Sequence, residues 1–179
     1  YLKYGRLTDS IGNQAAILTH IQASENVSGV SARVRIESFI QSAGGTSGVV
    51  LNGIDPEDEK NVTTLHQHLE AGNYLENYKR KPPIIIGQKL ATKLNAKVKT
   101  TLQCAFTDAN GLPALGVFKV VDIFSTSTSM YDEVNAFVRL EDLQAISAID
   151  GVHEIALTLH DEKQVESYRE ELISAFGNQ

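Results

Sequence analysis

Four carboxylates lie close together between residues 55 and 59: Asp55, Glu57, Asp58 and Glu59. Neighbouring carboxylates can share acid–base work or bind a cation. Their spacing is not that of a calcium-binding loop, and they flank Pro56, which is tolerated in the first turn of a helix. Because acidic side chains stabilise a helix N-terminus, we interpret the group as the start of a short helix.

The other groups that could do chemistry are isolated along the chain. His66 and His68 would point about 200° apart on the helix that Leu65 and Leu69 favour, so they cannot share a metal ion. Cys104 is the single cysteine and lies in an apolar run, which is typical of a buried thiol. Neither a phosphate-binding loop nor a nucleophile elbow occurs in the sequence. We therefore predict no catalytic residue, no metal site, no cofactor and no enzymatic activity.

The composition is that of an ordinary globular protein. Of 179 residues, 42% are hydrophobic and 21% are charged, and the net charge is −6. The basic footprint of nucleic-acid binding is absent, so we expect no nucleic-acid partner. No apolar run reaches the ~18 residues that could span a bilayer. The sequence begins at Tyr1, so we expect either a removed leader or a segment of a longer protein.

The periodicity of apolar residues predicts alternating strands and helices. In strand 30–37 one face is apolar, and Ser38 is predicted to break the alternation, with Phe39 out of phase. In the final helix Val165, Tyr168, Leu172 and Phe176 are predicted to face the core. The expected strands cover 1–4, 30–37, 49–51, 84–86, 98–106, 114–124, 134–138 and 153–160. The expected helices cover 8–25, a short stretch from Pro56, a second ending at Gly72, 88–94, 140–149 and 163–176. Residues 43–48, 73–81 and 125–129 are predicted to be loops or turns.

This order places β-α-β at the front, a strand-rich middle and β-α at the end. The front and the end can close one open-faced sandwich, with the middle inserted as a second unit. Both ends of the chain would then lie on the same side.

Several short motifs occur in a fixed order. They are the run Gly-Val-Val-Leu-Asn-Gly-Ile-Asp-Pro-Glu-Asp-Glu at 48–59, Leu-Glu-Ala-Gly at 69–72, Ile-Ile-Gly-Gln-Lys-Leu-Ala at 85–91, Phe-Lys-Val-Val-Asp-Ile-Phe at 118–124, and Tyr-Asp at 131–132. In order and spacing they resemble the large extracytoplasmic domain of FtsX-like ABC transporter permeases. These are the MacB and lipoprotein-releasing LolC/LolE type, and the motifs are most similar to LolE-like members. The resemblance covers most of residues 30–160.

All of these motifs are predicted to be structural. We expect Gly53 and Asp55-Pro56 to turn a strand into a helix, and Gly87 to allow a sharp strand-to-helix turn. The chain departs from the family pattern at Asp122, where a glycine is usual.

The resemblance implies an α+β fold with a porter-like α/β sandwich subdomain at 1–43 and 151–179, and an inserted strand-rich subdomain at 44–150. It implies a segment between the first and second transmembrane helices of an inner-membrane permease, on the periplasmic (extracytoplasmic) side. The implied function is coupling of ATP-driven motion to an envelope substrate such as a lipoprotein or lipid. The implied partners are a separate ATP-binding subunit, a second permease in a dimer, and a periplasmic carrier. A scaffold that recruits a periplasmic effector such as a peptidoglycan hydrolase is the alternative, and a standalone enzyme ranks last.

A hairpin engages the lipoprotein carrier in LolC-like members, and the equivalent here is 106–117. We therefore predict partner contacts at its tip and in the loop 73–81, which carries Tyr74 and Tyr78. The predicted contact residues are Asn110, Gly111, Leu112, Pro113, Tyr74, Leu75 and Tyr78.

Overall fold

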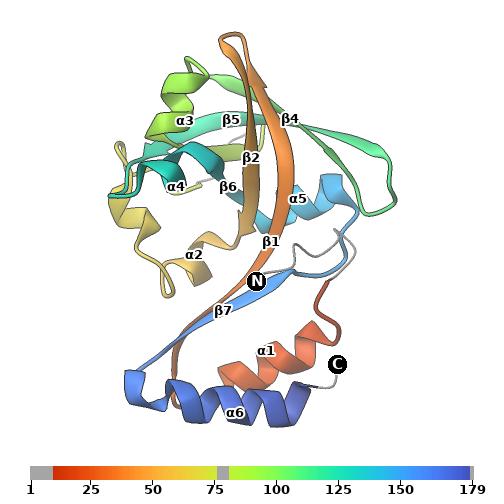
Figure 1. The fold of residues 1–179 in the computed structure, drawn as a ribbon, viewed down its shortest axis with the longest axis vertical. Coiled ribbons are helices and arrows are strands. Elements are labelled where there is room, and N and C mark those ends of the chain that lie inside the picture. Colours follow the sequence, from red (N-terminus) through yellow and green to blue (C-terminus); the bar gives the residue numbers. More distant parts are fainter. Residues whose placement is uncertain (1–9, 76–80, 178–179) are drawn as a thin grey trace.

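The computed structural model describes residues 10–75 and 81–177 (Figure 1). The strands are β1 Val27–Ser42, β2 Gly45–Ile54, β3 Pro83–Gly87, β4 Thr101–Thr107, β5 Pro113–Phe124, β6 Asn135–Arg139 and β7 Glu154–Leu159. The α-helices are α1 Gln14–Gln22, α2 Pro56–Glu59, α3 Gln88–Lys93, α4 Ser129–Val134, α5 Leu140–Ser147 and α6 Val165–Phe176. Two 3₁₀ helices, η1 Leu65–His68 and η2 Glu162–Gln164, complete the described elements.

Most of the strands form a closed ring. Their order is β2-β6-β3-β5-β4-β1, and β1 pairs with β2 to close the barrel. The pairs β2–β6 and β3–β5 are parallel, whereas β1–β2, β1–β4, β4–β5 and β3–β6 are antiparallel. Closure removes exposed sheet edges from this part of the molecule.

Strand β1 belongs to two parts of the molecule at once. Its second half pairs with β2 from Val34 to Ser42, and its first half pairs with β7 from Val27 to Arg33. Below the barrel, the β1–β7 ribbon is covered by α1 and α6, which lie side by side (Figure 1). The two described ends of the chain therefore lie on the same side.

The barrel interior is filled by the inward faces of its strands. Along β1 the buried side chains are Val34, Ile36, Ser38 and Ile40, while Phe39 points outward. The predicted break at Ser38 was wrong, because the Ser38 hydroxyl donates a hydrogen bond to the carbonyl of Ala105 (3.1 Å) and can therefore stay buried in phase.

A second core lies outside the barrel, beneath the segment 60–75. It contains Ile54, Leu65, Tyr74, Leu75, Ile85, Val121, Phe124 and Phe137. Strand β3 is consequently buried on both faces, which explains its unbroken run of isoleucines. The predicted exposed polar loop at 73–81 was wrong for Tyr74 and Leu75, which close this core.

Three other local predictions need correction. Residues 129–134 form helix α4 in place of the predicted loop, which shifts the next strand to Asn135–Arg139. Helix α1 begins at Gln14, later than predicted. In α6 only Tyr168 is fully buried, and Val165 is half exposed because it lines a groove between α6 and β7. The predicted strand at 1–4 lies outside the described residues.

Both motif glycines make room for a neighbour. Gly87 has an ordinary extended backbone (φ −70°), so no special turn requires it. A Cβ atom there would lie 2.1 Å from the backbone oxygen of Asp132. Gly53 lies within β2, where a Cβ would meet the side chain of Leu143 at 3.0 Å. These glycines therefore allow α4 and α5 to approach the barrel.

Asp122, where the resemblance leads us to expect a glycine, has a structural role. It is fully buried, and its carboxylate accepts hydrogen bonds from the backbone N–H groups of Ala71 (3.0 Å) and Asn73 (2.7 Å). The carboxylate thus holds residues 71–73, part of the segment that covers the second core, in place by hydrogen bonds.

The structure bears out a mixed α/β fold. The proposed subdomain boundaries at 43/44 and 150/151 stay a prediction, and the second half of β1, assigned to the porter-like part, pairs within the barrel.

Candidate functional site

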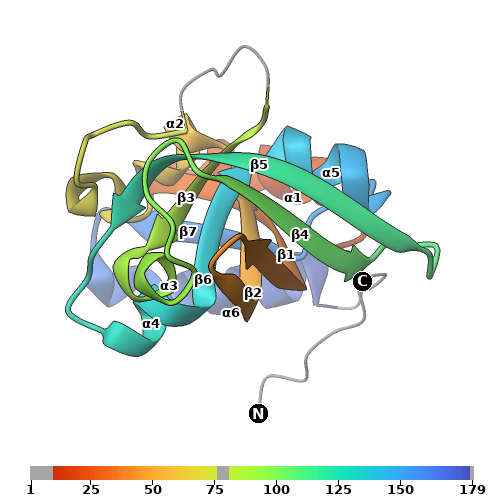
Figure 2. The ribbon, with the colours of Figure 1, turned by 90° about the horizontal axis from the view of Figure 1, so that it is seen from above.

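The hairpin formed by β4 and β5 projects from the barrel (Figures 1 and 2). Its turn is built around Asp108, whose carboxylate accepts hydrogen bonds from the backbone N–H groups of Asn110 (2.9 Å) and Leu112 (2.8 Å). Gly111 supplies the positive φ of 79° that the turn requires. The backbone N–H of Ala109 also donates to the carbonyl of Ser147 (2.9 Å), so the local sequence and the end of α5 together fix the tip.

The outward face of this hairpin continues onto β1. Where β1 pairs with β4, Phe39 lies opposite Ala105. Where β4 pairs with β5, Ala105 lies opposite Leu115, and Gln103, two residues away on β4, lies opposite Val117. Phe39 is 66% exposed and Leu115 is 73% exposed. We call Phe39, Leu115 and Val117 the outer apolar face.

The outer apolar face carries no charge of its own. The side chains between its members are those of Gln41, Gln103 and Ala105. Large exposed apolar side chains that cluster on one surface are typical of protein-interaction sites. The arrangement can therefore bind an apolar surface, and it has no group suited to acid–base or nucleophilic chemistry.

The predicted contact residues fall into two places. Asn110, Gly111, Leu112 and Pro113 are exposed at the hairpin tip. Tyr74 and Leu75 are buried in the second core. Tyr78 lies outside the described residues. The structure thus does not bring the predicted set together.

Sequence reasoning missed the outer apolar face. The sequence pattern predicts Phe39 to be out of phase, and it assigns Leu115 and Val117 only to the strand 114–124. The signal that could have found them is the strict alternation of β1, which places Phe39 opposite to the buried Ile36 and Ile40.

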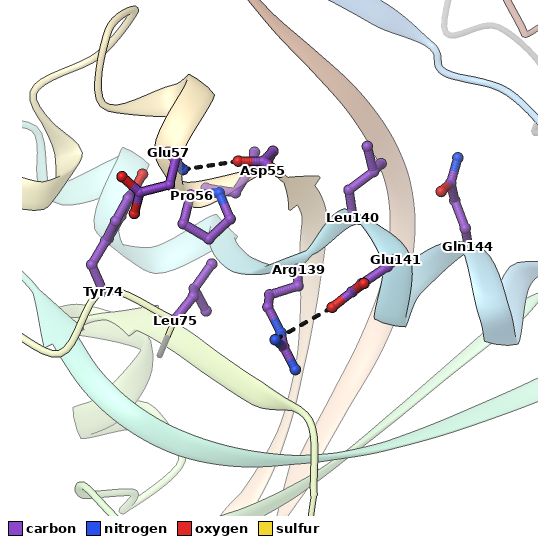
Figure 3. Close-up of a pocket in the computed structure, with 10 residues that line it drawn as sticks. Asp55, Pro56, Glu57, Tyr74, Leu75, Arg139, Leu140, Glu141 and Gln144 are labelled. Carbon is purple, nitrogen blue, oxygen red and sulfur yellow. Dashed lines mark hydrogen bonds and ion pairs between the residues drawn. The ribbon is translucent and has the colours of Figure 1, made fainter. Parts of the chain in front are cut away.

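A cleft of about 470 Å³ lies beside the second core (Figure 3). Its walls include Asp55, Glu57, Tyr74, Arg139 and Glu141. The predicted helix start is confirmed here, because the Asp55 carboxylate accepts the backbone N–H groups of Glu57 (2.9 Å) and Asp58 (3.2 Å). The Asp55 carboxylate of the cleft is therefore occupied as a helix cap, and the Glu57 and Glu141 carboxylates are occupied in ion pairs.

Ion pairs hold the guanidinium of the cleft in place. Arg139 forms ion pairs with Glu141 (3.3 Å) and Asp142 (3.0 Å). Burial, followed by the charge of Asp55, raises the pKa of Asp58. Burial also raises the pKa of the Tyr74 hydroxyl well above its ordinary range, so it stays protonated at neutral pH. The cleft offers no general base next to a nucleophile.

Ionised side chains are buried where the barrel meets the β1–β7 ribbon. Glu59 of α2 is 2% exposed and accepts hydrogen bonds from Ser31 (2.7 Å), Thr63 (3.0 Å) and Arg33 (2.9 Å to each carboxylate oxygen). Arg33 also pairs with Glu154 of β7 at 2.6 Å. We call Arg33, Glu59 and Glu154 the junction cluster.

The opposite charges of the junction cluster stabilise one another. Burial alone would lower the pKa of the Arg33 guanidinium, but hydrogen bonding to Glu59 and the negative charges of Glu59 and Glu154 raise it above its usual value. Four hydrogen bonds from three side chains, those of Ser31, Thr63 and Arg33, hold Glu59 in one geometry. The cluster therefore ties α2, β1 and β7 together.

Other candidate groups are structural in the described ranges. Burial raises the pKa of the Cys104 thiol to about 12, so it is not a nucleophile. Across residues 10–75 and 81–177, no three His, Cys, Asp or Glu side chains are grouped so that they could hold a metal ion. None of the described helices combines the length and apolar character needed to cross a membrane.

The sequence is similar to lipoprotein-releasing proteins. It is 28% identical over 140 residues to the "Lipoprotein-releasing system transmembrane protein LolC" of Xylella fastidiosa, covering 75% of this chain and 34% of that protein. It is 28% identical over 138 residues to LolC of Neisseria meningitidis, covering 73% and 33%. The chain thus spans about a third of the length of the curated relatives it matches. No protein-family model matches the chain.

The fold is similar to that of solved transporter domains. The extracellular domain of the noncanonic ABC-type transporter YknZ from Gram-positive bacteria has a TM-score of 0.63 at 15% identity, covering 94% of this chain and 83% of that one. The periplasmic region of MacB from Actinobacillus actinomycetemcomitans has a TM-score of 0.58 at 12% identity, covering 91% and 74%. Together with the LolC match, these findings confirm the predicted resemblance to extracytoplasmic domains of LolC/FtsX/MacB-like permeases, whereas the closer similarity to LolE-like members stays a prediction.

Proposed function

We propose, on the premise that this chain is an extracytoplasmic domain of the LolC/FtsX/MacB-like type of ABC permease, that it couples ATP-driven motion to the handling of an envelope substrate such as a lipoprotein. It would do so on the periplasmic side of the inner membrane without catalysing a reaction. A separate ATP-binding subunit would supply the energy, and two permeases would work as a pair.

The continuous strand β1 is the observation that carries this proposal. One strand of 16 residues belongs to the β1–β7 ribbon at one end and to the barrel at the other. The junction cluster braces it on both sides through α2 and β7. A displacement of the ribbon would therefore move the barrel as one body, which is what mechanical coupling requires.

The hairpin tip and the outer apolar face would be the surface that meets a carrier or effector protein. Leu112 at the tip, with Phe39 and Leu115 on the face, present apolar side chains on a rigid sheet. Rigid apolar anchors lose little conformational entropy on binding. The scaffold for a peptidoglycan hydrolase is not favoured, because the relatives found are transporters and lipoprotein-releasing proteins.

The test uses the full-length permease with its ATP-binding subunit in proteoliposomes loaded with a lipoprotein. The double variant Phe39→Glu/Leu115→Glu should reduce lipoprotein release at least tenfold while ATP hydrolysis stays within twofold. Met130→Glu is the matched control, since Met130 is 75% exposed on α4, away from this surface. Unchanged release by the double variant, or an equal loss with Met130→Glu, would overturn the proposal.

A further inference from the structure

The chain separates its charges along the sequence. Residues 81–119 contain six lysines and Asp108 as their single acidic residue, a net charge of +5, whereas the other residues together carry −11. Asp108 is held in the turn at the hairpin tip, where its carboxylate accepts two backbone N–H groups. A stretch of one sign within an acidic protein creates a local surface that attracts the opposite charge.

Four of these lysines meet where β4 begins beside β5. Lys119 of β5 lies opposite Thr101 of β4, and the ammonium group of Lys81 donates to the Thr101 hydroxyl at 3.4 Å. The backbone N–H of Lys99 donates to the carbonyl of the residue that follows Lys119 (2.7 Å), and Lys97 belongs to the same turn as Lys99. We call Lys81, Lys97, Lys99 and Lys119 the lysine cluster.

Neighbouring carboxylates do not neutralise the lysine cluster. In the part of the chain that the structure describes, no acidic side chain forms an ion pair with any of its members, whereas Lys93 nearby in the sequence pairs with Glu133 at 2.9 Å. Three of the four lysines are exposed, and Lys119 is half-buried. Because like charges repel, a bound anion would stabilise this arrangement.

The lysine cluster directly continues the outer apolar face. Leu115, Val117 and Lys119 are alternate residues of β5, so their side chains lie on the same side of the sheet. The residues opposite them on β4 are uncharged: Ala105, Gln103 and Thr101. This side of the sheet therefore changes from apolar to cationic with no carboxylate between the two parts.

The order of apolar and cationic side chains fits an amphiphile with an anionic headgroup. Exposed apolar side chains such as Leu115 gain free energy when an acyl chain removes them from water. Lysine ammonium groups bind phosphate as point charges. Val117 and Lys119 are two residues apart, or about 7 Å along the strand, which is comparable with the glycerol unit between the acyl chains and the phosphate of a phospholipid.

We propose that the outer apolar face and the lysine cluster together bind one molecule of an anionic phospholipid. Its acyl part would lie along Leu115 and Val117, and its phosphate would meet Lys119 and the other members of the cluster. The inference rests on the proposed handling of an envelope substrate and names the class of that substrate. Leu112 at the hairpin tip is outside this surface and stays accessible to a carrier.

Nuclear magnetic resonance titration of the 179-residue chain tests this inference without transport. The probe is dihexanoyl phosphatidylglycerol, kept below the concentration at which it forms micelles. Saturable shifts should appear in the amides of residues 99–101 and 115–119, and the dissociation constant should be at least tenfold lower than for dihexanoyl phosphatidylcholine or inorganic phosphate. Equal binding of inorganic phosphate would overturn the proposal, and so would a response to phosphatidylglycerol vesicles alone.

Charge-matched variants locate the phosphate. Lys97→Gln/Lys119→Gln should weaken phosphatidylglycerol binding at least tenfold. Lys60→Gln/Lys163→Gln removes the same charge at α2 and η2 and should change it less than twofold. Equal losses in the two double variants would overturn the proposal, because the lipid would then respond to net charge alone.

A third variant tests the acyl part. Leu115→Gln/Val117→Gln keeps every lysine and should also weaken phosphatidylglycerol binding at least tenfold, with the resonances of the buried core unchanged. Unaltered affinity would overturn the proposal, and so would binding of poly-glutamate in place of the lipid, which would assign the lysines to a protein partner. Failure of lipoprotein release in the full-length permease would count against the proposed function and leave the lipid titration unaffected.

Discussion

The junction cluster and the outer apolar face reverse the usual distribution of side chains. The first buries charges between α2, β1 and β7, and the second exposes phenylalanine, leucine and valine to solvent. Every charge in the junction cluster has a partner, so burial there fixes how α2, β1 and β7 lie relative to one another. The side chains of the outer apolar face are instead 40–73% exposed in the part of the chain that the structure describes. The contrast teaches that the buried polar groups hold the molecule together, whereas the exposed apolar groups are available for a partner.

Removing the central carboxylate should break the junction cluster. Glu59→Ala leaves the Arg33 guanidinium partly buried with one ion pair fewer, and we expect a loss of about 3–5 kcal/mol in the free energy of unfolding. Urea denaturation measures this. Glu57→Ala is the control on the same helix, where the side chain is largely exposed, and it should change stability by less than about 0.5 kcal/mol. A small effect for both would show that the cluster does not hold the parts together.

Substituting glycine for Asp122 should lower the free energy of unfolding. Asp122→Gly removes the acceptor of the Ala71 and Asn73 N–H groups, which would be left without partners and cost about 1–3 kcal/mol. Urea denaturation should show the loss, and amide exchange at these two residues should accelerate. Unchanged exchange would mean that the segment 69–73 is held by apolar packing alone.

High pH should destabilise the folded chain through Cys104. Burial raises the pKa of its thiol to about 12 in the folded state, above its value in the unfolded chain. The associated stability is fully present below the unfolded pKa and is lost as pH rises toward the folded one. Between pH 8 and 10 the free energy of unfolding should fall by about 1 kcal/mol. The fall should be smaller in Cys104→Ala, and an identical pH dependence would contradict this assignment.

Changes to the outer apolar face should hardly affect stability. Phe39→Ser and Leu115→Ser each remove a side chain that is mostly in solvent, so each should shift the free energy of unfolding by no more than about 0.5 kcal/mol. Ile40→Ser, one residue away and fully buried, is the comparison and should cost several times more. Urea denaturation of the three variants checks this. A large loss for Phe39→Ser would mean that the face contributes to the fold.

Local chemistry was largely readable from the sequence. The cap at Asp55, the hairpin at 106–117 and the burial of Cys104 depend on neighbours within a few residues or on simple alternation, and all three are found as predicted. The order of motifs also predicted the resemblance to transporter domains. These features survive because backbone geometry and apolar periodicity act over short distances.

Contacts between residues far apart in the sequence could not be predicted from it. Gly87 is glycine because the backbone of Asp132 passes close by, and Asp122 is buried because it accepts N–H groups from some 50 residues away. Tyr74 is buried because strands from elsewhere in the chain form its neighbours. A single sequence contains no sign of which remote atoms will meet.

The sequence by itself determined most of the strands and helices and the local caps and turns that join them. Only the tertiary structure decided that β1 serves two parts of the molecule, that Arg33 and Glu59 meet, and that Phe39 and Leu115 share one exposed face. The physical reason is that backbone preferences are local, whereas burial and pairing depend on strand register between segments far apart in the chain.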